Sequence, residues 1–96
     1  MHEHITKPKI EDIIETLHAV REVCSRYEKK YKMLSEQFFE LYSKGLLDDD
    51  GLNYDFVDWA GSYKTVIEAE GLYNESIKYA TVDEKLAQIR SHALVS

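Results

Sequence analysis

The sequence has few of the residues that break helices or cross-link chains. Its 96 residues include one proline, four glycines and a single cysteine, Cys24. One cysteine excludes an internal disulfide and is typical of a cytosolic protein. No apolar run approaches the roughly 20 residues that a membrane span requires. The first residues, MHEHITKPK, lack the apolar core of a signal peptide. We therefore expect a cytoplasmic protein with no membrane partner and few tight turns.

The charge is distributed unevenly along the chain. The net charge is −6, yet residues 33–75 alone carry two lysines and ten acidic residues. Such a segment repels a nucleic-acid backbone and attracts a basic protein. We therefore expect no nucleic-acid partner. The plain alternative is that the acidic residues only keep a small helical protein in solution.

A regular apolar pattern predicts a long first helix from about Pro8 to Lys32. Neither glycine nor proline interrupts residues 9–34. Apolar residues recur there at alternating intervals of three and four, at Ile10, Ile13, Leu17, Val20, Cys24, Tyr27, Tyr31 and Leu34. This spacing is typical of a helix packed along a long seam, and it favours a homodimer through that seam.

A short second helix is predicted over residues 36–44. Ser35 is a residue type favoured at helix N-caps. Gly45 suits the left-handed conformation that often follows a helix. The second helix is therefore expected to connect closely to the first.

A third helix is predicted from about Tyr54 to Tyr73. Asn53 is placed to cap it, and Phe56, Trp59 and Tyr63 form an apolar stripe along it. Gly71 leaves open whether this helix continues to Ala80, because glycine weakens helix interiors.

A fourth helix is predicted over residues 81–94. Its start, TVDE, matches a capping box in which Thr81 caps the helix and Glu84 reaches back. Val82, Leu86, Ile89 and Ala93 give it an apolar stripe. The predicted fold is one all-α domain over residues 1–96, with residues 1–7 mobile. Two long helices form a hairpin, with a short connecting helix and a short C-terminal helix.

The three consecutive aspartates Asp48, Asp49 and Asp50 raise the question of a metal site. A calcium-binding loop of the common helical type has glycine at its sixth position and glutamate at its twelfth. Counted from Asp48, these positions hold Asn53 and Trp59, and counting from Asp50 fits no better. We therefore expect no dedicated calcium site in this loop.

The sequence offers no convincing catalytic site. Catalysis by paired carboxylates also needs a pocket and an orienting partner. The four histidines do not fall at the spacing of a zinc-binding helix, and no glycine-rich phosphate loop is present. Cys24 occupies a core position of the first helix, where a cysteine is more often an apolar filler than a nucleophile. We therefore expect no enzyme activity, no cofactor and no metal.

Residues 28–66 resemble a family of small bacterial and archaeal helical proteins that are often encoded beside a presumed toxin gene. The family has a core of the type KYxMxxEEFxxxYxxGxLxDDxxFxxW. The matching residues are Lys30, Tyr31, Met33, Ser35, Phe38, Tyr42, Gly45, Asp48, Asp49, Phe56, Trp59 and Tyr63. The sequence departs from the pattern where GLNY lengthens the acidic turn. The resemblance implies an antitoxin-like role without catalytic residues.

Charge, aromatic content and resemblance together predict a non-catalytic protein–protein interaction module. Its partners are expected to be a second copy of itself and a small basic, toxin-like protein. The residues expected to bind the basic partner are Asp48, Asp49, Asp50, Asp55, Asp58, Trp59 and Tyr63. Two alternatives remain. One is a self-assembling scaffold with no toxin partner, and the other is a metal-dependent enzyme that uses Asp48–Asp50.

Overall fold

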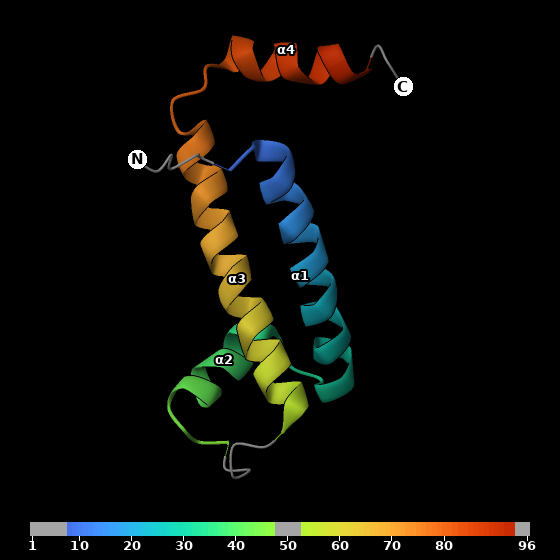
Figure 1. Cartoon of the computed structure of the whole chain (residues 1–96), viewed down its shortest axis with the longest axis vertical. Helices are drawn as coiled ribbons and strands as arrows, with labels where there is room; N and C mark the ends of the chain where they lie inside the picture. The colour runs from blue at the N-terminus through green and yellow to red at the C-terminus, as the bar shows by residue number, and fades with distance from the viewer. Residues whose placement is uncertain (1–7, 48–52, 94–96) are drawn as a thin grey trace, which may run out of the picture.

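The computed structural model describes residues 8–47 and 53–93 and contains only helices there. The helices are α1 (Ile10–Tyr31), α2 (Ser35–Ser43), α3 (Tyr54–Ile77) and α4 (Val82–Ala93). The long helices α1 and α3 run antiparallel as a hairpin, α2 lies between them in sequence, and α4 follows at the far end (Figure 1). The predicted all-α hairpin is therefore confirmed. The mobility expected of residues 1–7 concerns residues outside the described part of the chain.

The seam of α1 packs against α3 of the same chain. Ile13, Leu17 and Cys24 are buried on α1, and Val20 is partly buried against the same core. The α3 side of the core consists of Trp59, Ala60, Val66 and Ala69. The seam from which a homodimer was predicted is thus already covered within one chain. Any dimer has to use another surface.

The start of α2 differs from the prediction that Ser35 caps it. Leu34 precedes the helix, and Ser35 is its first helical residue. The Ser35 backbone N–H and hydroxyl both donate to a carboxylate oxygen of Glu28, at 2.9 and 2.7 Å. The cap of α2 therefore comes from a side chain of α1, and the Ser35 hydroxyl is left to face the core.

The C-terminal end of α2 and the N-terminal end of α3 follow the sequence prediction. Gly45 has a φ of +71° just after α2, and the Leu46 N–H donates to the Leu41 carbonyl at 3.0 Å. The Asn53 side chain accepts from the Phe56 N–H at 3.2 Å, so it caps α3. Gly71 does not end α3, which continues to Ile77.

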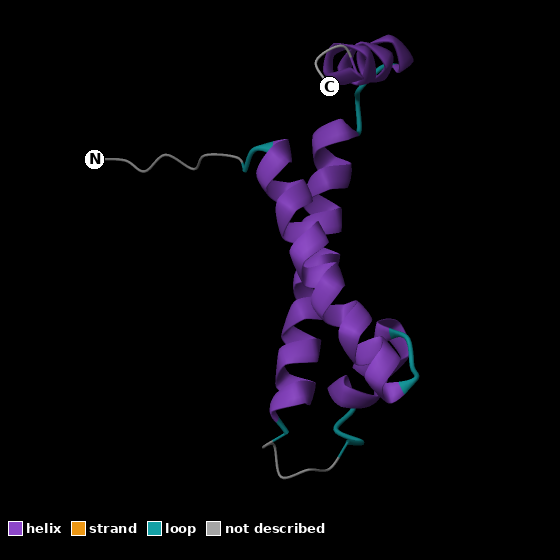
Figure 2. Ribbon diagram, turned by 90° about the vertical axis from the view of Figure 1, so that its right-hand side faces the viewer, coloured by secondary structure: helices purple, strands orange, loops and turns teal. Residues whose placement is uncertain are grey.

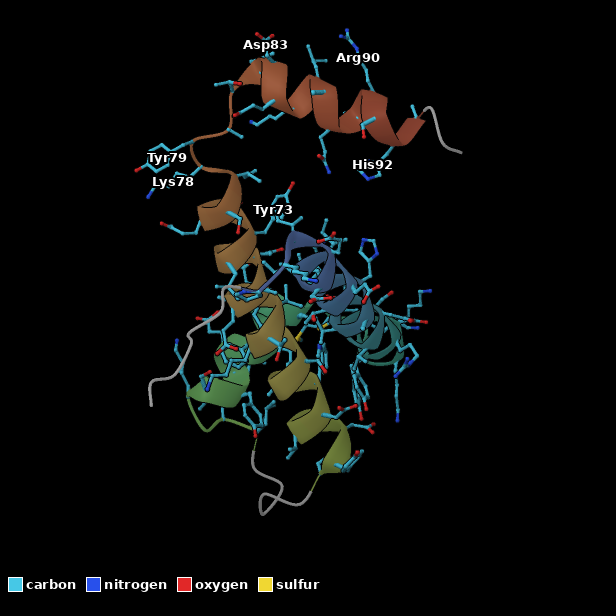
Figure 3. The ribbon with its side chains drawn as sticks, turned by 45° about the horizontal axis from the view of Figure 1, so that its top comes forward. Tyr73, Lys78, Tyr79, Asp83, Arg90 and His92 are labelled. Atoms are coloured by element: carbon cyan, nitrogen blue, oxygen red, sulfur yellow. The ribbon has the colours of Figure 1, made fainter. Side chains whose placement is uncertain are left out.

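The last helix, α4, stands apart from the hairpin. Its predicted capping box is present, because the Thr81 N–H donates to Glu84 at 2.8 Å and the Glu84 N–H donates to the Thr81 hydroxyl at 3.1 Å. No residue of α4 is buried, and it packs against none of the other described helices. It lies across the open end of the hairpin, with Arg90 and His92 pointing to opposite sides (Figures 1 and 3).

No helix within residues 8–47 and 53–93 is both long and apolar enough to cross a membrane.

Candidate functional site

Trp59 lies at the centre of an aromatic cluster that joins three helices. Its side chain is 1% exposed, and its ring stacks on Phe38 of α2 with centroids 3.8 Å apart and planes 1° from parallel. The rings of Tyr27 and Tyr31 on α1 also stack on Trp59, with ring centroids 5.7 and 5.6 Å away. The indole N–H donates to the Ser35 hydroxyl at 2.7 Å. Trp59, which was predicted to bind a partner, offers no surface in this structure and supports the site from inside.

Asp55 and Asp58 bind side chains of α1. The Tyr31 hydroxyl and the Lys30 ammonium each donate to Asp55 at 2.6 Å. The Tyr27 hydroxyl donates to Asp58 at 2.8 Å. These two predicted site residues are therefore half-buried acceptors that fix the start of α3 against the end of α1.

The same bonds shift the pKa values of the groups involved. Hydrogen bonds from Lys30 and then Tyr31 lower the pKa of Asp55 below its ordinary value. The bond to Asp58, together with burial and the nearby negative charge, raises the pKa of Tyr27 to about 12. The Asp55 carboxylate is therefore ionised at neutral pH and Tyr27 is neutral, which is the state that these bonds require.

Tyr63 lies where α2 meets α3, among acidic side chains. It is half-buried and packs on Phe39 of α2 with ring centroids 5.4 Å apart. Burial, followed by the negative charges of Glu36 and Glu70, raises the pKa of its hydroxyl. We call Tyr63, Glu36 and Glu70 the acidic junction. Of the predicted aromatic site residues, Tyr63 is the one that remains partly exposed.

The two glutamates of the acidic junction have different partners. Both are exposed, and Glu70 forms an ion pair with Arg21 of α1 at 2.5 Å. Glu36 makes no ion pair with any residue of 8–47 and 53–93. Glu36 is thus the carboxylate of the junction that is available to an incoming cation without breaking an internal pair.

Asp48, Asp49 and Asp50 lie outside the described residues. Of the described residues that flank them, Leu47 packs against the core and Asn53 caps α3.

Sequence reasoning missed Glu36 and Glu70. Tyr63 and Glu70 are seven residues apart, so helical spacing alone places them on one face of α3. Nothing in the sequence relates Glu36 to them, because its position depends on how α2 packs against α3.

Neither metal chemistry nor a reactive thiol emerges from the described residues. Within 8–47 and 53–93, no group of three or more His, Cys, Asp or Glu side chains is arranged to hold a metal ion. Cys24 is buried, and burial raises the pKa of its thiol. A thiol of raised pKa is a poor nucleophile at neutral pH.

Comparison with known proteins adds no family assignment. No protein-family model matches the chain, and neither a curated protein nor a solved structure shows significant similarity to it.

Proposed function

We propose that this chain is a non-catalytic protein–protein interaction module, the antitoxin-like member of a small prokaryotic toxin–antitoxin pair. It binds a basic partner through the acidic junction and the aspartates Asp48–Asp50. The cytoplasm is the compartment that this role requires.

The observation that carries the proposal is the half-buried Tyr63, which packs on Phe39 and is exposed to the negative charges of Glu36 and Glu70. An aromatic ring held rigidly beside carboxylates is suited to receive an arginine or lysine side chain, by ion pairing and by contact with the ring face. The surrounding segment, residues 33–75, has ten acidic residues and two lysines, so it attracts a basic protein over some distance.

The predicted site residues then divide into two roles. Asp48–Asp50 and Tyr63 face the partner in this proposal. Asp55, Asp58 and Trp59 act indirectly, since their hydrogen bonds and stacking hold α3 in the position that presents Tyr63.

The test is association with the product of the neighbouring gene, after co-expression and separation of the two chains. Changing Asp48, Asp49 and Asp50 together to Asn lowers the association rate about tenfold at low salt and flattens its salt dependence, because steering charge is lost. Glu36→Gln also slows association. Glu68→Gln is the matched control, because Glu68 is exposed on α3 and lies five residues from Tyr63, on a different side of the helix.

Two results would contradict this function. One is an association rate that is the same for wild type and the triple Asn variant at low salt. The other is an equal effect of Glu36→Gln and Glu68→Gln, which would mean that only net charge matters.

The exposed apolar side of α4 favours a second candidate, a self-assembling scaffold without a toxin partner. A gene with no small basic protein beside it, together with self-association into assemblies larger than a dimer, would favour the scaffold. Binding of calcium or manganese to the isolated chain would instead favour the alternative of a metal-dependent enzyme.

A further inference from the structure

The face of the hairpin that α2 covers continues beyond α2 as an open groove. On α1, Glu28 contacts α2, and Arg21 lies seven residues before it on the same side of the helix. On α3, Tyr63 contacts α2, and Glu70 lies seven residues after it. Figure 2 shows α2 against one side of the hairpin near its closed end and α4 beyond the open end.

This groove is a hollow of about 400 Å³ between α1 and α3. We call it the upper groove, and its lining residues are Ile14, Leu17, His18, Arg21, Glu70, Tyr73 and Asn74. Its apolar part comes from Ile14, Leu17 and Tyr73. The helix α2 already packs on this face nearer the closed end of the hairpin. The upper groove therefore has the geometry of a second helix-binding position.

The rim of the upper groove on α1 is acidic. Glu15 and Glu22 lie three residues before and four residues after His18, so they stand beside it on the helix surface. Both are exposed, and neither pairs with a cation among residues 8–47 and 53–93. A helix that enters the groove therefore meets negative charge at this edge.

The free side of α4 complements the groove in shape and charge. Val82, Leu86 and Ile89 form its apolar stripe and are 72%, 41% and 67% exposed. Val82 and Ile89 are seven residues apart, as are Ile14 and Arg21, so both surfaces extend about 10 Å along a helix. Lys85 and Arg90 lie on the two flanks of the stripe.

The charge distribution points to a second copy as the source of the docked helix. The chain is acidic overall, whereas residues 76–96 carry three basic and two acidic residues. Two acidic hairpins repel each other, so the surface of one copy best able to approach the hairpin of another is the α4 end. In its own chain, α4 lies across the end of the hairpin (Figure 1), and no residue of α4 lines the groove.

We propose that α4 of one copy docks in the upper groove of a second copy, and that the second copy returns the same contact. Each chain has one upper groove and one α4, so a two-fold exchange fills both upper grooves and closes the assembly. The connection of residues 78–81 between α3 and α4 serves as the hinge. The contact is a helix laid in a groove with its apolar residues as anchors. This dimer contact is separate from the binding of a basic partner at the acidic junction and does not depend on that binding.

Sedimentation of the full chain over a wide concentration range tests the dimer. We expect a reversible dimer for wild type. Ile89→Asp on α4 and Ile14→Asp in the groove each raise the dimer dissociation constant by about tenfold or more, because each places a charge in an apolar contact. Ser91→Asp is the matched control. It lies two residues after Ile89, on the opposite side of α4, and leaves the dimer intact.

Mixing the two damaging variants separates the proposed exchange from other dimers. The Ile14→Asp chain retains an intact α4 and the Ile89→Asp chain retains an intact groove, so the mixture forms one of the two contacts and sediments faster than either variant alone. Unchanged Trp59 fluorescence shows that each variant is folded.

Three outcomes would overturn the proposal. They are a wild-type monomer at every concentration, a dimer that survives both damaging substitutions, and a mixture that sediments no faster than its components. A monomer in which the amides of α4 are protected from hydrogen exchange would place the helix in its own groove, which also contradicts docking on a second copy.

Discussion

At the scale of single residues, the centre of the protein depends on one chain of hydrogen bonds. The Trp59 indole donates to the Ser35 hydroxyl, and that hydroxyl donates to the Glu28 carboxylate. The three residues come from α3, α2 and α1, so each helix is tied to the other two. A buried donor without an acceptor is costly, and therefore these bonds favour one register of the three helices.

We expect Ser35→Ala to destabilise the protein by about 1–3 kcal/mol, because the buried Trp59 N–H loses its acceptor. Denaturant unfolding followed by helix circular dichroism measures the change. Ser76→Ala is the control, since the Ser76 hydroxyl is exposed and bonds only to the Leu72 carbonyl within α3. Its effect is within about 0.5 kcal/mol. Equal effects of the two substitutions would show that the interior hydroxyl contributes nothing.

The Tyr27–Asp58 bond predicts a loss of stability in alkali. The pKa of Tyr27 is raised from its ordinary 10.0 to about 12 in the folded chain. Folding therefore favours the protonated hydroxyl, and this contribution is complete below pH 10 and is lost as the pH rises to about 12. Asp58→Asn lowers the pKa of Tyr27 toward 10, as measured by tyrosine ring-carbon NMR.

Asp55→Asn is the comparison variant, because Asp55 accepts a hydrogen bond from the Tyr31 hydroxyl. It lowers the pKa of Tyr31 more than that of Tyr27. A Tyr27 titration unaffected by Asp58→Asn would show that the raised pKa has another cause.

At the scale of helices, the two turns that end α1 and α2 use different residues for the same geometry. Gly45 and Lys32 both have positive φ, at 71° and 58°. Glycine adopts this conformation freely, whereas a residue with a Cβ is strained by roughly 1–2 kcal/mol. The end of α1 is therefore less favourable than the end of α2.

We expect Lys32→Gly to stabilise the protein by about 0.5–1 kcal/mol, because relief of the strained φ outweighs the extra freedom of glycine in the unfolded chain. Lys29→Gly is the reverse control. Lys29 lies inside the last turn of α1, so glycine there destabilises the protein by about 1 kcal/mol. Thermal unfolding of the two variants should shift in opposite directions, and a shift of Lys32→Gly to lower temperature would contradict the account.

At the scale of the whole molecule, the chain is extended for its length. Its radius of gyration is 17.5 Å, whereas a compact domain of this size has roughly 12 Å. Within residues 8–47 and 53–93, the eight buried apolar residues all belong to α1, α2 and α3, and α4 adds none. A single copy therefore leaves apolar side chains on α4 uncovered. The proposed dimer would cover these side chains at the open end of the hairpin.

The sequence by itself determined most of the helices and their ends. The three–four spacing identified the inner side of α1, with Ile13, Leu17 and Cys24 buried as predicted. Asn53, Gly45 and the Thr81–Glu84 pair act as predicted because capping and positive φ are local properties of a few neighbouring residues. Such features are readable from sequence since they depend on no distant contact.

Only the tertiary structure decided what covers each helix and which polar groups meet. A heptad pattern shows that one side of α1 is buried but does not show which helix packs against it. That helix is α3 of the same chain. Ser35 looked like a cap because its residue type favours that role, yet Glu28 supplies the cap and Ser35 binds Trp59. Asp55 and Asp58 looked free because their tyrosine partners lie 24 and 31 residues away in sequence. Contacts across such separations depend on how the helices pack, and for that reason the role of each carboxylate became visible only in the folded chain.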